Sequence, residues 1–204
     1  MKKIMFNDKY GLTKAVLDGR KTMTRRAVNK ITIDRANDYV QKVYGSGHDM
    51  LDYFLEHPLY KVGEVVAVAQ KYSEIEIPIS GETRIYNEGL DLYQSKLEYE
   101  PGWTNKMFVK ADLMPHRIRI THIRVERLHS ITVADCFKEG INTIVEGESK
   151  IGNPWGWDTK VDYFKRDNYL TPLQAFAALI DKVSGKGTWA SNPWVFVYEF
   201  ELVK

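Results

Sequence analysis

Two long stretches of the chain alternate apolar and polar residues, which is the pattern of a β-strand with one buried face. Near the end of the sequence, apolar side chains occupy every second position: Trp194, Phe196, Tyr198, Phe200 and Leu202. The stretch 117–128 alternates as well, but its apolar positions change parity between Ile120 and Ile123. A one-residue slip of this kind marks a bulge or a sharp bend, here near Thr121-His122. Such bends suit a small closed barrel.

Shorter apolar runs predict further strands. Residues 4–6 are apolar and predict a short strand close to the start of the chain. Residues 65–69 are five consecutive apolar residues, which is typical of a strand buried on both faces. We also expect short strands around 75–79 and 83–86, before a polar loop. With the two long strands, these runs predict a mostly antiparallel sheet.

Two helical segments are predicted in the first third of the chain. The first begins at Asn7 or Asp8, runs to residue 18 and ends at Gly19, where a left-handed conformation is needed. The second covers residues 34–57 in two pieces that the glycines of 45–47 separate.

Two more helices have clear start and stop signals. Thr132 and Asp135 form a capping pair for a short helix that Gly140 ends, so Glu139 is its last side chain. The run Thr171-Pro172-Leu173-Gln174 combines a cap, a proline at the first position and a capping-box glutamine. Gly185 ends that helix. Helices and an antiparallel sheet together predict an α+β fold.

Composition leaves the class of partner open. The chain has 204 residues, of which 44% are hydrophobic and 27% charged, and its formal net charge is only +2. These values are ordinary for one globular domain, and affinity for nucleic acid would require a local basic patch. The single cysteine, Cys136, permits no internal disulfide and fits a cytoplasmic, reducing environment. We expect it to be buried. The apolar run at the start is too short for a signal peptide, and no stretch approaches the roughly 20 apolar residues of a membrane helix.

Several kinds of chemistry lack their sequence motifs. The chain has no zinc-ligand spacing, no HExxH motif, no EF-hand, no phosphate-binding loop and no nucleophile elbow. Its five histidines are scattered along the sequence, and we expect each to be structural. We therefore expect neither a metal nor a cofactor.

One basic stretch contains more functional groups than a turn needs. Four cations and two hydroxyls occur within eight residues, Gly19-Arg20-Lys21-Thr22-Met23-Thr24-Arg25-Arg26. A solvated basic edge strand has the same composition. If the stretch is extended from residue 21, Thr24 lies on one face and Lys21 on the other. Lys21 and Thr24 therefore converge only if Lys21 belongs to the turn.

This stretch resembles the Gly-x-Lys-x-x-x-x-Arg signature of ASCH domains, small barrels related to the PUA domain of RNA-modifying enzymes. Further blocks resemble the family in the same order along the chain: Val62-Gly63-Glu64-Val65-Val66, Met114-Pro115, Arg124-Val125-Glu126-Arg127-Leu128, Glu139-Gly140-Ile141, Gly185-Lys186-Gly187-Thr188-Trp189 and Asn192-Pro193-Trp194-Val195. The last two are similar to the tail of the longer members from phages and bacteria. The resemblance implies one PUA-like barrel domain over 1–204, with insertions at about 27–60, 73–112 and 142–170.

The resemblance also implies a basic cleft for RNA or a modified nucleoside. Some small ASCH proteins are amidohydrolases that remove the acyl group from acetylated cytidine without a metal, and the residues carried over are Lys21, Thr24 and Glu139. Other members bind or cleave RNA, so membership alone does not choose among these functions. Longer relatives often have a glutamate where this chain has Gln70.

Each candidate residue has a chemical role and an alternative. Thr24 is a possible nucleophile if a neighbour takes its proton. Lys21 can do so only when neutral, which requires its pKa to fall from about 10.4 to near 7. A charged Lys21 would instead hold an oxyanion or a phosphate. Glu139 would protonate the leaving amine, or is a surface carboxylate before a helix-ending glycine.

The remaining residues suit a binding role. Trp155 and Trp157 would stack on a base, although tryptophans are more often part of a core. In the RNA-binding alternative, phosphate contacts would come from Arg20, Lys21, Arg25, Arg26 and Lys30. A third alternative, a partner-binding protein without catalysis, predicts neither RNA binding nor turnover. The sequence leaves the oligomeric state open.

Overall fold

The computed structural model describes residues 1–42, 49–75, 99–143, 157–158, 169 and 171–203, and it has an α+β fold. Five strands form one mixed, mostly antiparallel sheet in the order β1-β3-β4-β7-β2. They are β1 (Lys3–Ile4), β2 (Met23–Ala27), β3 (Val65–Val68), β4 (Arg117–Arg127) and β7 (Trp194–Val203). A separate antiparallel pair consists of β5 (Asn142–Thr143) and β6 (Trp157–Asp158). The α+β class and the mostly antiparallel sheet expected from the sequence are confirmed.

The two long strands, β4 and β7, pair antiparallel at the centre of the sheet. Their register shifts between Ile120 and His122, so Thr121 is the extra residue of a β-bulge, where the change of parity predicted one. The bulge returns apolar side chains to the same face, because Ile123 pairs with Tyr198 just as Ile120 pairs with Phe200. β1 pairs parallel with β3, and the other neighbours are antiparallel.

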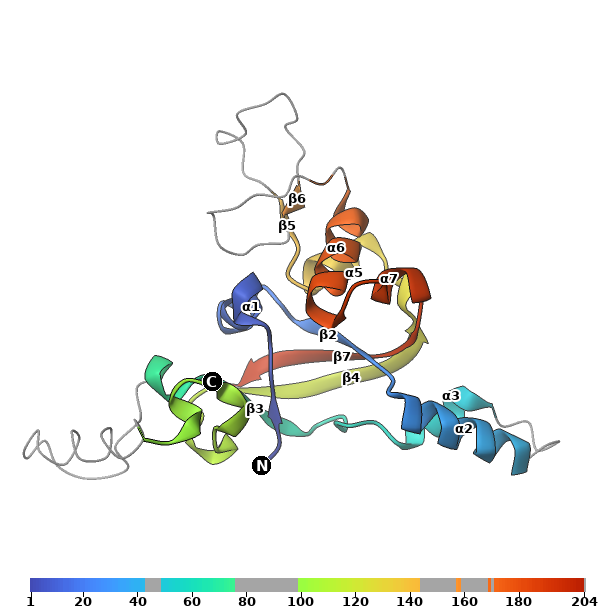
Figure 1. The fold of residues 1–204 in the computed structure, drawn as a ribbon, viewed down its shortest axis with the longest axis horizontal. Helices are drawn as coiled ribbons and strands as arrows, with labels where there is room; N and C mark the ends of the chain where they lie inside the picture. Colours follow the sequence, from blue (N-terminus) through green and yellow to red (C-terminus); the bar gives the residue numbers. More distant parts are fainter. Residues whose placement is uncertain (43–48, 76–98, 144–156, 159–168, 170, 204) are drawn as a thin grey trace, which may run out of the picture.

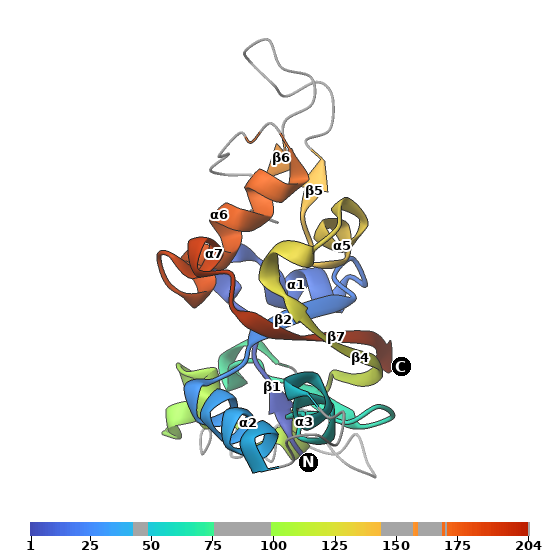
Figure 2. The same cartoon turned by 90° about the vertical axis from the view of Figure 1, so that its right-hand side faces the viewer.

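Helices cover both faces of the sheet. Their bounds are α1 (Leu12–Leu17), α2 (Lys30–Lys42), α3 (Met50–Glu56), α5 (Val133–Lys138), α6 (Pro172–Ser184) and α7 (Thr188–Ser191). Figures 1 and 2 show α1, α5 and α6 on one side of the β4–β7 pair and α2 and α3 on the other. Short 3-10 turns lie at Asp8–Tyr10, Tyr72–Glu74, Pro101–Trp103, Lys106–Phe108, Ala111–Leu113 and Leu128–Ser130.

The helix signals are largely confirmed. Thr132 and Asp135 form the predicted capping box of α5, and the Thr171 hydroxyl accepts from the Gln174 N–H at the start of α6. The prediction for the first helix was wrong in one respect. Gly11 has φ +64°, which interrupts the helix and leaves a 3-10 turn before α1.

Closure into a PUA-like barrel is not seen in the described part of the chain. There the sheet is open, with β1 and β2 as its two edge strands. A strand was expected at 75–79, but Ile75 follows a 3-10 turn and is not part of a strand. Residues 76–98 lie outside the described residues, and so does the strand predicted at 83–86. The glycines of 45–47 also lie outside the described residues. Among the described helices, none is long and apolar enough to cross a membrane.

Candidate functional site

Lys21 belongs to the turn between α1 and β2. Gly19 has φ +73°, and the backbone N–H groups of Arg20 and Lys21 both donate to Ala15 O at 2.9 Å. The strand begins only at Met23. Lys21 therefore does not follow the alternation of β2, and the condition for its side chain to meet Thr24 is fulfilled.

A pocket of about 80 Å³ lies along β2, and it has room for several water molecules. Its polar lining is Asn7, Lys21, Thr24, Arg25, Arg26, Glu139 and Ser184. Its apolar lining includes Phe6, Leu12, Phe176, Leu179, Ile180 and Val183, most of which belong to α6. Because β2 is an edge strand, residues from both of its faces reach the pocket. The structure thus brings the three predicted catalytic residues to one pocket.

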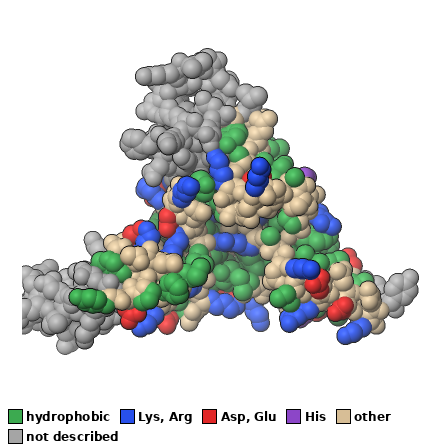
Figure 3. All heavy atoms as spheres, viewed as in Figure 1, with side chains coloured by type: hydrophobic (Ala, Val, Ile, Leu, Met, Phe, Trp, Pro, Cys, Tyr) green, Lys and Arg blue, Asp and Glu red, His purple; other side chains and the backbone are tan. Residues whose placement is uncertain are grey.

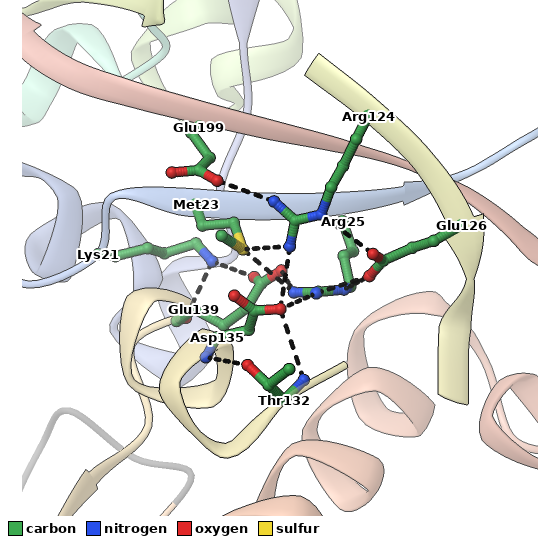
Figure 4. Close-up of polar contacts among 9 residues, drawn as sticks. All are labelled: Lys21, Met23, Arg25, Arg124, Glu126, Thr132, Asp135, Glu139 and Glu199. Carbon is green, nitrogen blue, oxygen red and sulfur yellow. Dashed lines mark hydrogen bonds and ion pairs between the residues drawn. The ribbon is translucent and has the colours of Figure 1, made fainter. Parts of the chain in front are cut away.

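Lys21 and Glu139 form a buried ion pair in this pocket. The Lys21 ammonium donates to Glu139 Oε2 at 2.6 Å and to the Glu139 backbone carbonyl at 2.9 Å (Figure 4). Their side chains are only 2% and 5% exposed. Burial lowers the pKa of Lys21, although Glu139 opposes the change, and the nearby charges of Arg26 and Arg25 lower it further. Lys21 is therefore biased toward the neutral form that a base requires.

Thr24 lies on β2 opposite Tyr198 and is 5% exposed. Within the described residues, no hydrogen bond engages its hydroxyl. That oxygen is therefore available to a ligand or a water in the pocket, and it lines the same space as the Lys21–Glu139 pair.

Arg25 is held by three carboxylates. Its Nε and Nη2 groups donate to Glu126 Oε1 at 3.1 and 2.7 Å, and Nη2 also donates to Asp135 Oδ2 at 2.7 Å. Its Nη1 group donates to Glu139 Oε1 at 3.2 Å and to the Met23 sulfur. These contacts use all five guanidinium N–H groups, and the side chain is 0% exposed. Burial opposes the charge, but the carboxylate of Glu139 and hydrogen bonds to Glu126 and Asp135 raise the pKa of Arg25.

Arg124 completes this network from β4 (Figure 4). It donates to Glu126 Oε2 at 3.0 Å, to Asp135 Oδ2 at 2.9 Å and to Glu199 Oε1 at 2.8 Å. Burial alone would raise the pKa of Asp135, but the hydrogen bond from Arg25 and the charges of both arginines lower it. Arg25, Arg124, Glu126 and Asp135 form what we call the anchor cluster, whose four formal charges cancel.

The remaining basic residues are placed apart from one another. The Arg26 guanidinium donates to Met5 O and lies 5.7 Å from the Phe6 ring centre, and burial lowers its pKa. Arg20 pairs with Asp18 at 2.9 Å outside the pocket. Lys30 is exposed at the first position of α2. On the face drawn in Figure 3, Lys and Arg side chains are dispersed rather than gathered into one patch.

Three other residues that the sequence singled out are not among the residues that line the pocket. Trp155 lies outside the described residues, and for Trp157 only the backbone, in β6, is described. Gln70 is buried after β3 and does not line the pocket; its Oε1 atom has no hydrogen-bond partner among the described residues. Cys136 is fully buried as expected, and burial raises the pKa of its thiol to about 12.

Sequence reasoning missed two groups of residues around the pocket. The anchor cluster was missed because its acids lie more than 100 positions from Arg25, although the capping role of Asp135 was visible. Asn7 and the wall from α6 were missed because an apolar helix stripe predicts burial and does not predict a pocket. No group of three ligating side chains among the described residues is arranged to hold a metal ion.

Comparisons of the chain with protein-family models, with curated proteins and with solved structures each found no match.

Proposed function

We propose that this protein is an amidohydrolase that removes the acyl group from an acylated cytosine nucleoside. One observation carries the proposal: Lys21, Thr24 and Glu139 line a single pocket, and the lysine is buried beside the glutamate. The resemblance to ASCH domains supports the substrate class. The pocket contributes the chemical groups that amide hydrolysis requires, namely a hydroxyl, a base and an acid.

The buried pair can act as a store for one shared proton. Burial penalises the charged forms, so a pair of neutral amine and carboxylic acid becomes accessible. In that form, Lys21 accepts the hydroxyl proton while Thr24 Oγ1 attacks the acyl carbon. The tetrahedral intermediate collapses, its carbon–nitrogen bond breaks, and Glu139 gives its proton to the leaving exocyclic amine.

A water molecule then closes the cycle. Its oxygen attacks the acyl ester on Thr24 while the Glu139 carboxylate takes its proton. The ester bond breaks, and the Lys21 ammonium returns a proton to Thr24 Oγ1. The products are the nucleoside and a carboxylic acid, and all three side chains regain their starting forms. The apolar wall from α6 limits the number of water molecules around these steps.

RNA binding through the basic stretch has less support from the site. All five N–H groups of Arg25 are already engaged by Glu126, Asp135, Glu139 and the Met23 sulfur. Arg25 therefore offers a phosphate little, whereas affinity for RNA depends mainly on cations that are available to phosphates. A pocket that encloses an amine, a hydroxyl and a carboxyl favours a small reacting group.

The test is release of cytidine from acetylcytidine by the purified protein with a chelator present. Lys21→Ala, Thr24→Ala and Glu139→Ala should each lower the rate at least about 100-fold, because residues that act as a unit are not additive. Thr22→Ala is the matched control, since it removes a neighbouring threonine that does not line the pocket. Its rate should stay close to that of the unchanged protein.

Two results would contradict the proposal. Turnover that survives Thr24→Ala and Glu139→Ala would exclude the assigned roles. If the unchanged protein shows no turnover above background, a titration with labelled single-stranded RNA at two salt concentrations becomes decisive for the binding alternative. Salt-sensitive binding that weakens in Arg26→Ala would support that alternative.

A further inference from the structure

None of the four residues of the anchor cluster reacts in the proposed chemistry, which uses Lys21, Thr24 and Glu139. Among the described residues, Glu139 is the only side chain that is hydrogen-bonded to both the cluster and Lys21: its Oε1 accepts from Arg25 and its Oε2 accepts from Lys21 (Figure 4). A carboxylate bound at one oxygen by a lysine alone could rotate about its terminal torsion, which has a broad energy profile. The bond from Arg25 fixes which oxygen faces Lys21.

The positive charge of Arg25 also acts on the proton of the pair, because it lowers the pKa of Lys21. Here that effect is opposed, because the Arg25 charge is shared with Glu126 and Asp135. Arg124 in turn binds both of these acids. The cluster is therefore neutral as a whole, while it keeps its rigid fork of hydrogen bonds.

We propose that Arg25 is a positioning residue that fixes the Glu139 carboxyl toward Lys21, and that Glu126 and Asp135 neutralise Arg25 so that the proton shared by Lys21 and Glu139 stays mobile. This inference rests on the proposed function for its catalytic consequence. The arrangement of charges that it describes can be measured without any substrate.

The proposal gives opposite signs for two variants. Arg25→Gln removes a positive charge near the pair and leaves acids uncompensated, so the Lys21–Glu139 pair should hold its proton to higher pH. Glu126→Gln removes a negative charge and leaves Arg25 less compensated, so the pair should lose its proton at lower pH. The charged groups that face Lys21 are Glu139 at the end of α5, with Arg25 and Arg26 on β2.

The first measurement is an NMR titration of the Lys21 side chain, assigned by its loss in Lys21→Met. Its midpoint should rise by about one pH unit in Arg25→Gln and fall by a smaller amount in Glu126→Gln. Glu201→Gln is the control, because Glu201 also pairs with an arginine of β4 but is 57% exposed. Its titration should match that of the unchanged protein.

The second measurement is turnover as a function of pH. Arg25→Gln should lower kcat about 100-fold with little change in KM, because the acid is misplaced while binding is kept. Its pH optimum should move up, and that of Glu126→Gln should move down. Arg25→Lys keeps the positive charge but loses the forked hydrogen bonds of the guanidinium group. It should therefore lower kcat, while its pH optimum should move less than that of Arg25→Gln.

The outcomes separate the two proposals. Opposite shifts of the Lys21 titration, with no turnover by any form, would support the positioning role and reject the proposed function. Turnover with an unchanged optimum in both variants, or a Lys21 titration that is the same in all folded variants, would overturn the positioning role. If Arg25→Gln does not fold, a downward shift in Glu126→Gln supports the proposal and an unchanged midpoint overturns it.

Discussion

The two faces of the sheet near β2 are buried in different ways. On one face, register pairs bring together apolar and aromatic side chains, such as Ile120 with Phe200 and Ile123 with Tyr198. On the other face, Arg25 and Arg124 flank Val197 from the two sides of β7, and their charges are covered by α5 and its end. The same three strands thus support an apolar core and an ionic cluster.

The difference between the two faces shows which kind of contact fixes the position of a side chain most closely. An apolar face gains stability roughly in proportion to buried area, and a loss at one position is local. A buried ionic face is stable only when every charge has its partner, because removal of one partner leaves a buried charge without compensation. The candidate site lies beside the ionic face, whose directional bonds fix the position of Glu139 more closely than apolar packing could.

The largest effect is expected when the ionic face loses one acid. Asp135→Ala removes the acceptor shared by Arg25 and Arg124, and we expect it to lower the free energy of unfolding by about 3–5 kcal/mol. Urea denaturation near neutral pH measures this loss. A cost below about 1 kcal/mol would show that the cluster contributes little to stability.

The dependence of this cost on pH separates it from a packing effect. The folded pKa of Asp135 lies below its ordinary value of 3.8. Its ionisation therefore stabilises the fold above that value, and the contribution is lost as the pH falls through the folded pKa. The stability difference between the unchanged protein and Asp135→Asn should shrink as the pH falls below about 3.8.

A smaller and pH-independent loss is expected on the apolar face. Ile120 is 0% exposed, and Ile120→Ala should lower the free energy of unfolding by about 3 kcal/mol through lost burial and a cavity. Ile120→Val, which removes one methylene, should cost about 1 kcal/mol. A pH-dependent loss in Ile120→Ala would mean that the two faces are coupled.

The smallest effect is expected for an exposed ion pair on the same strands. Arg119 donates to Glu201 at 3.2 Å, and both side chains are about half exposed, at 49% and 57%. Arg119→Gln should change the free energy of unfolding by no more than about 0.5 kcal/mol, because solvent screens such pairs. If Arg119→Gln lowered the free energy of unfolding as much as Asp135→Ala does, burial could not explain why the two ion pairs differ in their contribution to stability.

The sequence predicted the parts of the fold that local patterns control. The change of parity located the bulge at Thr121, and capping residues located the starts of α5 and α6. The first helix was mispredicted because its apolar spacing continues through Gly11, while the backbone there is left-handed. Barrel closure depends on pairings between distant segments, and no local pattern records them.

Of the candidate site, the sequence alone could predict only the part that lies within the short basic stretch 19–26. Lys21 and Thr24 lie three positions apart, so the sequence could pose the question of whether they meet. Glu139 entered only through the resemblance, since nothing local shows that a helix end will reach a strand more than 100 positions away. Arg25 was assigned to phosphate contacts because it lies in a stretch rich in basic residues. Its burial depends on acids far away in the sequence, which a local pattern cannot pair with it.

The end of α5 has a consequence for how the sequence can vary. Gly140 has φ +96°, and a Cβ atom placed there would lie 3.5 Å from the Lys21 Cβ atom. Residues with side chains rarely adopt this backbone conformation, and anything longer than a methyl group would push against the lysine. A position with no functional group of its own therefore limits which substitutions the pocket tolerates, and mutational scanning of this protein should find Gly140 as restricted as the reacting residues beside it.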